Sequence, residues 1–196
     1  CACTIVKHTT PCGTASADSP LEAFNKALAC DPVSAFGGII GMTRAVDMET
    51  AKAVTETFFE IIAAPSYESG VAEYLANKKP NLRVLTITPG YAPKLQITGN
   101  RCGFLVQEDS LPPIPQMDNG HWVGEPKPEL WEDLLFAWKT AAITKSNAIV
   151  LVKDGAAVGI GGGFTNRVDA AEYALKLAKD AASGSVLASD AFFPFP

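Results

Sequence analysis

The chain has 196 residues, of which 47% are hydrophobic and 19% are charged, and its formal net charge is -5. This composition is typical of a globular protein with one domain or two small lobes. The acidic balance, without a run rich in lysine and arginine, argues against nucleic-acid binding. No stretch approaches the ~18 apolar residues that cross a bilayer, and no signal peptide precedes the first strand, so we expect no membrane partner.

The cysteines predict a reducing environment. There are five of them, unevenly spread and without a Cys-x-x-Cys pair, which does not suit a disulfide framework. We therefore expect a cytoplasmic protein. The sequence opens inside an expected strand without Met and closes on an aromatic and proline-rich run, residues 191–196. From these ends we expect an internal piece of a longer polypeptide.

The first residues carry the first candidate site. An apolar run, residues 3–6, predicts a buried strand that delivers Lys7 and His8 into a turn at residues 9–13. Where the chain bends, both side chains can face one pocket. A histidine can take a proton near neutral pH, and a lysine can stabilise a developing oxyanion. The common alternative is a surface lysine beside a histidine that merely ends a strand.

Strands and helices alternate along the first part of the chain, which indicates α/β units around one sheet. We expect helices at 20–30, 47–58 and 71–78, a turn followed by a strand within 33–40, and strands at 60–65 and 82–85. Residues 109–128 are rich in proline and glycine and predict a connector. The expected domains are a first lobe at 1–108, this connector, and a second lobe at 129–196.

The second lobe repeats the theme of the first. A helix precedes residue 144, a strand spans 148–154, a helix spans 167–182 and a strand spans 185–188. Ser-Asp-Ala-Phe after the last helix resembles Ser-Ala-Phe after the first. We infer two related α/β lobes with a site between them, and expect residues 3–40 to overlay residues 148–193 as strand, helix, strand.

Two familiar motifs are incomplete in this sequence. His8 and Cys12 suggest a zinc deaminase, but the glutamate and the second cysteine of that motif are missing, so we expect no zinc. Residues 159–163 contain Gly-x-Gly, but Phe164 stands where the last glycine belongs, so we expect no NAD. These glycines permit a close approach to a ligand or the other lobe, and a flexible hairpin loop is the alternative. Asn147 is either a pocket amide or a helix cap.

Six segments in order match one family: residues 6–13, 34–38, 64–67, 145–148, 159–163 and 188–195. Over essentially its whole length the chain resembles the AICAR transformylase domain of the bifunctional purine-biosynthesis family that also carries IMP cyclohydrolase. The resemblance implies formyl transfer from 10-formyltetrahydrofolate to the 5-amino group of AICAR, giving FAICAR in IMP synthesis. It also implies a duplicated, zinc-free cytidine-deaminase-like α/β fold, with the cyclohydrolase domain absent from this chain.

The resemblance also implies site residues. It makes His8 the general base on the amino group, Lys7 the charge that stabilises the oxyanion, and Asn147 the amide that positions the formyl group. The substrate and folate contacts that it implies are Phe36, Gly37, Glu60, Arg167, Phe192, Pro194 and Phe195.

A monovalent-cation site, for potassium, is implied near Thr144, Ser146 and Asp190. The family further implies a homodimer with AICAR and a folate as its small-molecule partners. An alternative of another class is a catalytically incomplete piece that only binds ligands or dimerises, because the family domain extends beyond this segment at both ends.

Overall fold

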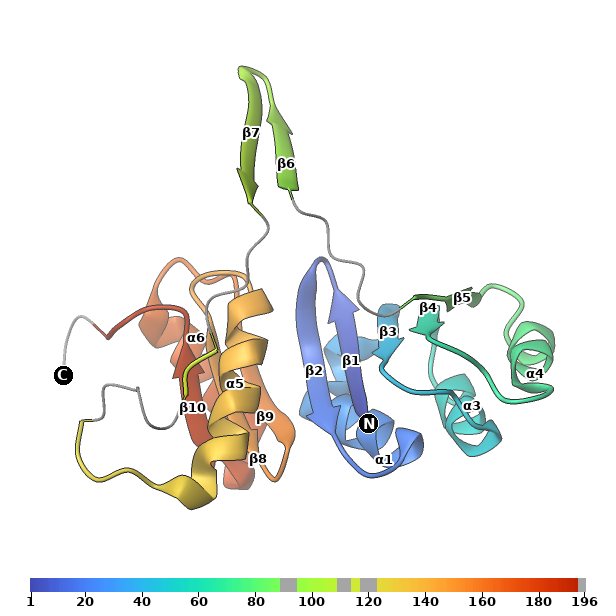
Figure 1. The fold of residues 1–196 in the computed structure, drawn as a ribbon, viewed down its shortest axis with the longest axis horizontal. Coiled ribbons are helices and arrows are strands. Elements are labelled where there is room, and N and C mark those ends of the chain that lie inside the picture. The colour runs from blue at the N-terminus through green and yellow to red at the C-terminus, as the bar shows by residue number, and fades with distance from the viewer. Residues whose placement is uncertain (89–94, 109–113, 117–122, 194–196) are drawn as a thin grey trace.

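The computed structural model describes residues 1–88, 95–108, 114–116 and 123–193. An eight-stranded sheet with the order β10-β8-β9-β2-β1-β3-β4-β5 runs through the molecule, and β6 and β7 form a separate hairpin (Figure 1). The large sheet contains β1 (Ala2–Lys7), β2 (Thr10–Ser16), β3 (Gly38–Met42), β4 (Phe59–Ala64), β5 (Arg83–Thr86), β8 (Ile149–Lys153), β9 (Ala156–Gly161) and β10 (Val186–Ser189). The hairpin pairs β6 (Leu95–Asn100) with β7 (Gly103–Glu108).

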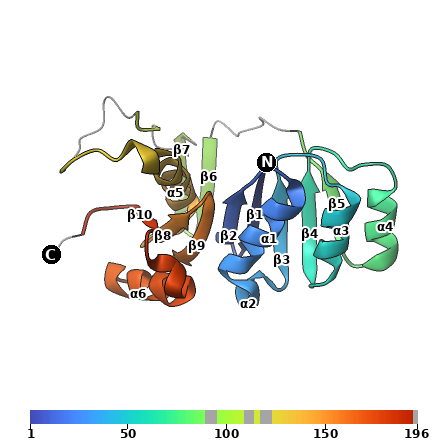
Figure 2. The same ribbon diagram turned by 90° about the horizontal axis from the view of Figure 1, so that it is seen from below.

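Helices cover the sheet unevenly. They are α1 (Pro20–Cys30), α2 (Pro32–Ala35), α3 (Met48–Thr55), α4 (Val71–Lys78), α5 (Trp131–Ile143) and α6 (Arg167–Ala178), with 3-10 turns at Pro128–Leu130 and Lys179–Ala182. On β8, Val150 and Val152 pack in the cluster under α5, whereas Ile149 and Leu151 pack in the cluster under α6. Because side chains alternate along a strand, α5 and α6 cover opposite faces (Figure 2). Among the described helices, none is long and apolar enough to span a membrane.

The largest core cluster joins α1, α3 and α4 to β1, β3 and β4. Phe24 of α1 and Ile5, Ile40 and Ile62 of the strands are at most 1% exposed. Each such side chain contributes about 1.5–3 kcal/mol by its removal from water. This cluster stabilises β1, which ends at Lys7 and leads directly into His8.

Most predicted helices are confirmed, and their capping residues explain where they begin. Ser19 accepts a hydrogen bond from the backbone N–H of Glu22 at 3.2 Å at the start of α1, and Pro20 follows it. Asp47 caps α3 in the same way through Thr50, at 2.7 Å. The predicted alternation of helices and strands is therefore observed over most of the described chain.

The turn predicted at residues 9–13 is wrong. The turn consists of His8 and Thr9 alone, and residues 10–16 form β2, paired antiparallel with β1. Pro11 lies opposite Val6, next to a register shift between β1 and β2. Proline has no N–H to donate to a neighbouring strand, and it is tolerated at such an irregularity. Strand pairing therefore overrides the local turn signal of Thr-Pro-Cys-Gly.

Most of the glycine-rich segment belongs to β9 rather than to a flexible hairpin loop, and only Gly162 and Gly163 follow the strand. A Cβ on Gly159 would lie 2.1 Å from the carbonyl oxygen of Ala174, and one on Gly161 would lie 2.1 Å from that of Ala170. Both carbonyls belong to α6. The close approach that these two glycines allow is therefore to α6 of the same half of the chain.

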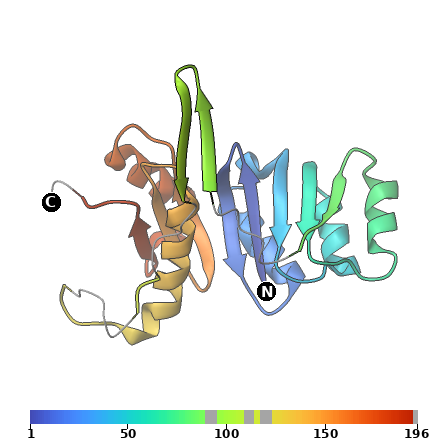
Figure 3. The same cartoon turned by 45° about the horizontal axis from the view of Figure 1, so that its top comes forward.

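Two further segments add to what was expected. The turn and strand expected within 33–40 are the short helix α2, which Asp31 caps, and then β3 from Gly38. The hairpin of β6 and β7 was not predicted, and it projects away from the sheet (Figures 1 and 3). Its strands are exposed along their whole length, so they lack the buried alternation that marks a core strand.

Two segments of the chain share an order of elements. β1, β2, α1 and β3 follow one another as hairpin, helix and strand, and so do β8, β9, α6 and β10. In each segment the last strand pairs antiparallel with the first. Gly13 of β2 approaches α1 as Gly159 of β9 approaches α6, since its Cβ would lie 1.9 Å from the Ala27 carbonyl oxygen.

Candidate functional site

Most predicted site residues lie at one end of the large sheet, which we call the His8 end. The β1–β2 turn is there, and the pairings place the starts of β3, β4 and β8 and the ends of β9 and β10 at the same end. It is the upper end of the sheet in Figure 1. Across the junction of β2 and β9, a Cβ on Gly162 would lie 3.4 Å from Thr10 Cγ2. Segments from both halves of the chain therefore meet there.

The His8 turn is held in a strained backbone conformation. His8 has φ 54° and Thr9 has φ 62°, as a two-residue turn of type I′ requires. The corresponding turn between β8 and β9 consists of Asp154 and Gly155, with φ 52° and 72°, which is a favoured pair for this geometry. Positive φ is uncommon for any residue other than glycine, and a β-branched threonine is a genuine outlier in this turn. Such strain is common where a side chain is needed for function.

Lys7 is fixed by the segment after α2. Its Nζ donates a hydrogen bond to the carbonyl oxygen of Phe36 at 2.7 Å. Gly37 follows with φ +75°, and its N–H donates to the carbonyl of Phe58 at 2.8 Å. The rings of Phe36 and Phe58 lie 5.4 Å apart, and Phe36 is 57% exposed. Lys7, Phe36 and Gly37, predicted separately, are therefore neighbours.

A pocket of about 290 Å³ opens beside this group. The residues that line it are Lys7, His8, Thr10, Pro11, Cys12, Asp31, Ser34, Ile160, Gly162 and Tyr173. They come from β1, β2, the α1–α2 junction, β9 and α6. The lining thus combines a base, a cation and a carboxylate in a partly enclosed space.

Cys12 contributes packing rather than nucleophilic chemistry. Burial, followed by the nearby Asp31 carboxylate, raises the pKa of its thiol, and Lys7 only partly opposes this. A thiol with a raised pKa stays protonated at neutral pH and is a poor nucleophile and metal ligand. Among the described residues, no group of three or more His, Cys, Asp or Glu is arranged to hold a metal ion.

The second cluster at the His8 end is built around Arg167, the first residue of α6. Its guanidinium donates to Asn147 Oδ1 at 2.7 Å, to Ser189 Oγ at 2.8 Å and to the Asp190 carboxylate. Asn147 Nδ2 in turn donates to the carbonyl of Phe164 at 2.9 Å. Because arginine can only donate and a carbonyl can only accept, the network fixes which way the Asn147 amide points.

Asp190 is the acceptor at the centre of this cluster. Its carboxylate also accepts from Ser146 Oγ and from the backbone N–H of Ala148, the latter at 2.8 Å. Burial raises its pKa, but hydrogen bonds from Ser146 and Ala148 and the charge and hydrogen bond of Arg167 outweigh burial and lower the pKa to about 2. Asp190 is therefore ionised throughout the neutral range.

The residues expected near potassium are brought together. Thr144, Ser146 and Asp190 line one cavity of about 360 Å³, together with Trp138 and Ser189. The Thr144 hydroxyl donates to the Thr140 carbonyl at 2.7 Å. The oxygens around this cavity are those of hydroxyl groups and an ionised carboxylate, which is a donor set for hard cations.

Other predicted residues stay apart from both clusters. Glu60 pairs with Arg83 of β5 at 2.9 Å, and both side chains are largely in solvent. Phe192 is 80% exposed, so in the described chain it forms no packed wall. Pro194 and Phe195 lie outside the described residues.

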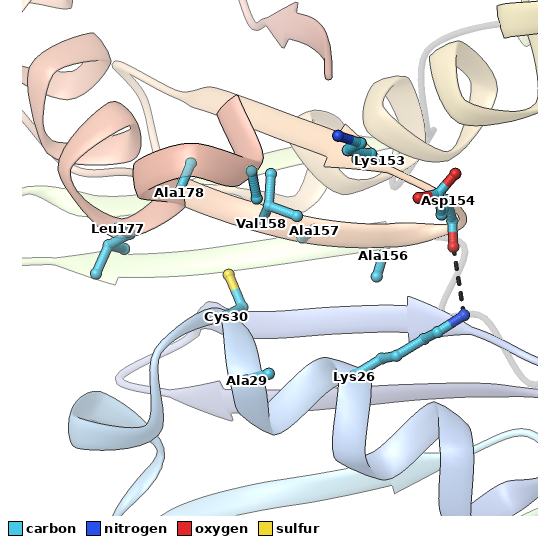
Figure 4. A pocket seen from close by; sticks show the side chains of 11 residues that line it. Lys26, Ala29, Cys30, Lys153, Asp154, Ala156, Ala157, Val158, Leu177 and Ala178 are labelled. Atoms are coloured by element: carbon cyan, nitrogen blue, oxygen red, sulfur yellow. Dashed lines mark hydrogen bonds between the residues drawn. The ribbon is translucent and has the colours of Figure 1, made fainter. Parts of the chain in front are cut away.

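A further cavity of about 450 Å³ lies between α1, β9 and α6, toward the Asp154 turn (Figure 4). Alanine and other apolar side chains form much of its lining, and Lys26 and Lys153 stand at its rim. Lys26 pairs with Glu22 at 3.0 Å and Lys153 donates to the Ser183 carbonyl at 2.8 Å. Of the predicted site residues in the described chain, none lines this cavity.

Sequence reasoning missed Asp31 and Tyr173. Asp31 was interpreted only as the end of a helix, yet it is 6% exposed and lines the His8 pocket. The burial of Asp31 is not visible in the sequence, so no local signal marks this residue as part of the site. Tyr173 had no signal, because its position on α6 gives no hint that it reaches residues of the first half.

Comparison with known proteins identifies the family. The family model for the AICARFT/IMPCHase bienzyme matches residues 1–177. The chain belongs to this family. It is 47% identical over 197 residues to the bifunctional purine biosynthesis protein PurH of Synechococcus elongatus, covering 99% of this chain and 38% of that protein. It is 48% identical over 193 residues to the PurH of Thermoanaerobacter sp., covering 97% of this chain and 38% of that protein. The chain thus spans less than half the length of these curated relatives.

Proposed function

We propose that the chain carries the formyl-transfer site of this family, which moves a formyl group from 10-formyltetrahydrofolate to the 5-amino group of AICAR in purine biosynthesis. The observation that carries the proposal is that Lys7 and His8 and the Asn147–Arg167 cluster lie at the same end of one sheet. Membership of the AICARFT/IMPCHase family supports the same chemistry. The IMP cyclohydrolase reaction is outside the proposal.

His8 is proposed as the general base. The AICAR amine is conjugated and weakly nucleophilic, so a base must take its proton as the nitrogen attacks the formyl carbon. His8 is exposed at the mouth of the pocket and its strained turn points to a functional side chain. As the bond to tetrahydrofolate breaks, the same imidazolium can return the proton to the leaving nitrogen.

Lys7 and Asn147 are proposed to stabilise the oxygen that becomes negative. Lys7 Nζ donates only to one carbonyl among its contacts in the described chain, which leaves donors free for an oxyanion. Asn147 Nδ2 has two hydrogens, and its contact with Phe164 uses one of them. Arg167 then acts on Asn147 by holding its oxygen, and also presents charge at the mouth of the site.

The folate is proposed to lie along Phe36 and Gly37, with Phe192, Pro194 and Phe195 closing the other side. The exposed ring of Phe36 beside Phe58 supplies a flat apolar surface of the kind a pterin needs. For Glu60 we propose a contact with the polar head of the substrate. Its present partner is Arg83, an exposed ion pair that is readily exchanged.

The cavity lined by Thr144, Ser146 and Asp190 is proposed as the potassium site. The ionised carboxylate supplies the charge and the Ser146 hydroxyl supplies a neutral oxygen. A cation there would stabilise the Ser146–Asp190 contact and hence the segment that carries Asn147. We propose no zinc and no NAD for this chain.

The repeated order of hairpin, helix and strand supports a duplicated cytidine-deaminase-like unit. The shared antiparallel pairing and the shared glycine approach to the helix agree with it. On this basis we propose lobes at 1–108 and 129–196 with the connector at 109–128. Separately, we propose that the protein works in the cytoplasm and has no nucleic-acid or membrane partner.

A homodimer is proposed through the hairpin of β6 and β7. Ile97 and Val106 are direct cross-strand partners on one apolar face and are 62% and 58% exposed. A two-stranded hairpin with such a face is marginal on its own and needs a partner. Arg101 at the tip and Glu108 at the base are the charged residues of the hairpin. A second copy packed antiparallel by two-fold symmetry would place each Arg101 near the partner copy's base.

The proposed function is tested by measuring FAICAR formation with AICAR and 10-formyltetrahydrofolate. Lys7→Met should lower turnover by about 10²–10³-fold, the loss expected for one oxyanion-stabilising donor. Lys52→Met on α3 is the matched control, since Lys52 is exposed and does not line the pocket of Lys7 and His8. No formyl transfer by the unsubstituted protein, or equal turnover for both variants, would contradict the proposal.

A further inference from the structure

Tyr173 lies between the two clusters at the His8 end, and no role has yet been assigned to it. It is a partly buried residue of α6 and lines the pocket of about 290 Å³ together with Lys7 and His8. Its helix belongs to the second half of the chain, whereas the first half supplies most of the pocket lining. Its ring and its hydroxyl contact different parts of the site.

The hydroxyl group faces the first half of the chain. Tyr173, Asp31 and Ser34 line the same pocket, and both Asp31 and Ser34 affect the pKa of the phenol. Asp31 Oδ1 accepts a hydrogen bond from the backbone N–H of Ser34 at 2.9 Å and so caps α2, and Phe36 follows the last residue of α2. The Phe36 carbonyl is the acceptor for Lys7 Nζ. A displacement of Asp31 by a change at the Tyr173 hydroxyl would therefore displace α2 and, with it, the carbonyl that Lys7 contacts.

Burial and the Asp31 carboxylate raise the pKa of Tyr173. The phenol therefore remains protonated at neutral pH and can act as a donor toward Asp31. Asp31 is 6% exposed, and a buried carboxylate oxygen without a donor is costly. Both facts favour keeping the tyrosine hydroxyl in this position.

The ring of Tyr173 faces the second cluster. It packs against Phe164 with the ring centroids 5.4 Å apart and the planes at 44°. The Phe164 carbonyl accepts both the backbone N–H of Asn147, at 3.1 Å, and Asn147 Nδ2, at 2.9 Å. Packing on Phe164 thus bears directly on the placement of the Asn147 amide.

We propose that Tyr173 is a positioning residue that sets the separation of Lys7 and Asn147 by holding Asp31 with its hydroxyl and Phe164 with its ring. The inference rests on the proposed function for its catalytic meaning. Lys7 and Asn147 are proposed to stabilise the same developing oxyanion, and they belong to different halves of the chain. A residue that contacts both halves, as Tyr173 does, can therefore fix the distance between them. A displacement of about 1 Å between reacting groups can cost on the order of 10²-fold in rate.

The kinetic test uses Tyr173→Phe, which keeps the ring and removes the hydroxyl. We expect kcat to fall about tenfold while KM for AICAR and for the folate stays within about twofold, because binding groups remain in place. Combining it with Asp31→Asn should lower kcat no further than the worse single variant, since both break one connection. Tyr74→Phe on α4, a partly buried tyrosine remote from the site, is the control. Unchanged kcat, a change in KM alone, or losses that multiply would overturn the inference.

Hydrogen exchange provides a readout that does not depend on activity. The N–H of Gly37 is bonded to Phe58, and that of Asn147 to Phe164. Tyr173→Phe should speed exchange about tenfold at Gly37, and Tyr173→Leu, which also removes the ring, should do so at both amides. Unchanged exchange in both variants would overturn the positioning role even if the enzyme is active. If the unsubstituted protein showed no formyl transfer, the proposed function would be overturned. The exchange measurement would then still decide whether Tyr173 positions Gly37 and Asn147.

Discussion

Replacing Asp190 by asparagine tests the electrostatics of the second cluster. Asp190 receives hydrogen bonds from Ser146, Ala148 and Arg167, and its side chain is 20% exposed. These donors stabilise the charged form, and the pKa falls from 3.8 to about 2. At 1.36 kcal/mol per pH unit, this lowering corresponds to roughly 2 kcal/mol of folding stability.

The sign of the pH dependence follows from the direction of that change. Because the folded pKa is lower than the unfolded one, the contribution is fully present above pH ~4 and is lost as the pH falls toward 2. Asp190→Asn should therefore be about 2 kcal/mol less stable than the unsubstituted protein at pH 7. The difference between the two proteins should shrink as the pH falls from 4 to 2.

The assay is urea unfolding of both proteins at several pH values, with Asp180→Asn as the control. Asp180 is an exposed carboxylate near the end of α6. Taking the difference between two proteins removes the titration of all the carboxylates that they share. A difference that stays constant between pH 7 and pH 2 would refute the assignment of stability to the Asp190 charge.

Three further predictions concern other parts of the fold. Thr9→Gly should raise stability by about 1 kcal/mol and the thermal midpoint by about 2–4 °C, because glycine relieves the positive φ; a lower midpoint would contradict the strain argument. Gly159→Ala should destabilise by at least about 1–3 kcal/mol in urea unfolding because its Cβ collides with α6, whereas Gly99→Ala in the exposed hairpin should not; equal effects would contradict this packing. Ile97→Ser should weaken self-association measured by sedimentation, unlike Gln96→Ser on the opposite face; equal sedimentation would argue against the hairpin interface.

The helices with clear capping signals were predictable from the sequence. Ser19 and Asp47 cap helices in the structure as their positions suggested, and α4 spans the residues expected for it. β2 was missed because its Pro and Gly are local turn signals, and only pairing with β1 and packing on α1 makes them part of a strand. The hairpin of β6 and β7 was missed because its strands bury nothing within the described chain.

The candidate site was predictable in its residues but not in its arrangement. Sequence motifs pointed to Lys7 and Asn147, yet only the pairing of β2 with β9 brings their segments to one end of the sheet. Asp31 and Tyr173 could not be identified, because their importance depends on a contact between α6 and the α1–α2 junction. Such contacts between distant segments leave no local pattern.

The central claim is that His8 acts as the base in formyl transfer, and comparing turnover with AICAR binding in His8→Ala tests it most directly. Turnover would be followed as FAICAR formation at saturating substrates, and binding by calorimetry with AICAR alone. The account predicts a loss of turnover of about 10²–10⁴-fold with AICAR affinity changed by only a few fold. Near-normal turnover, or a loss explained entirely by weaker AICAR binding, would contradict it.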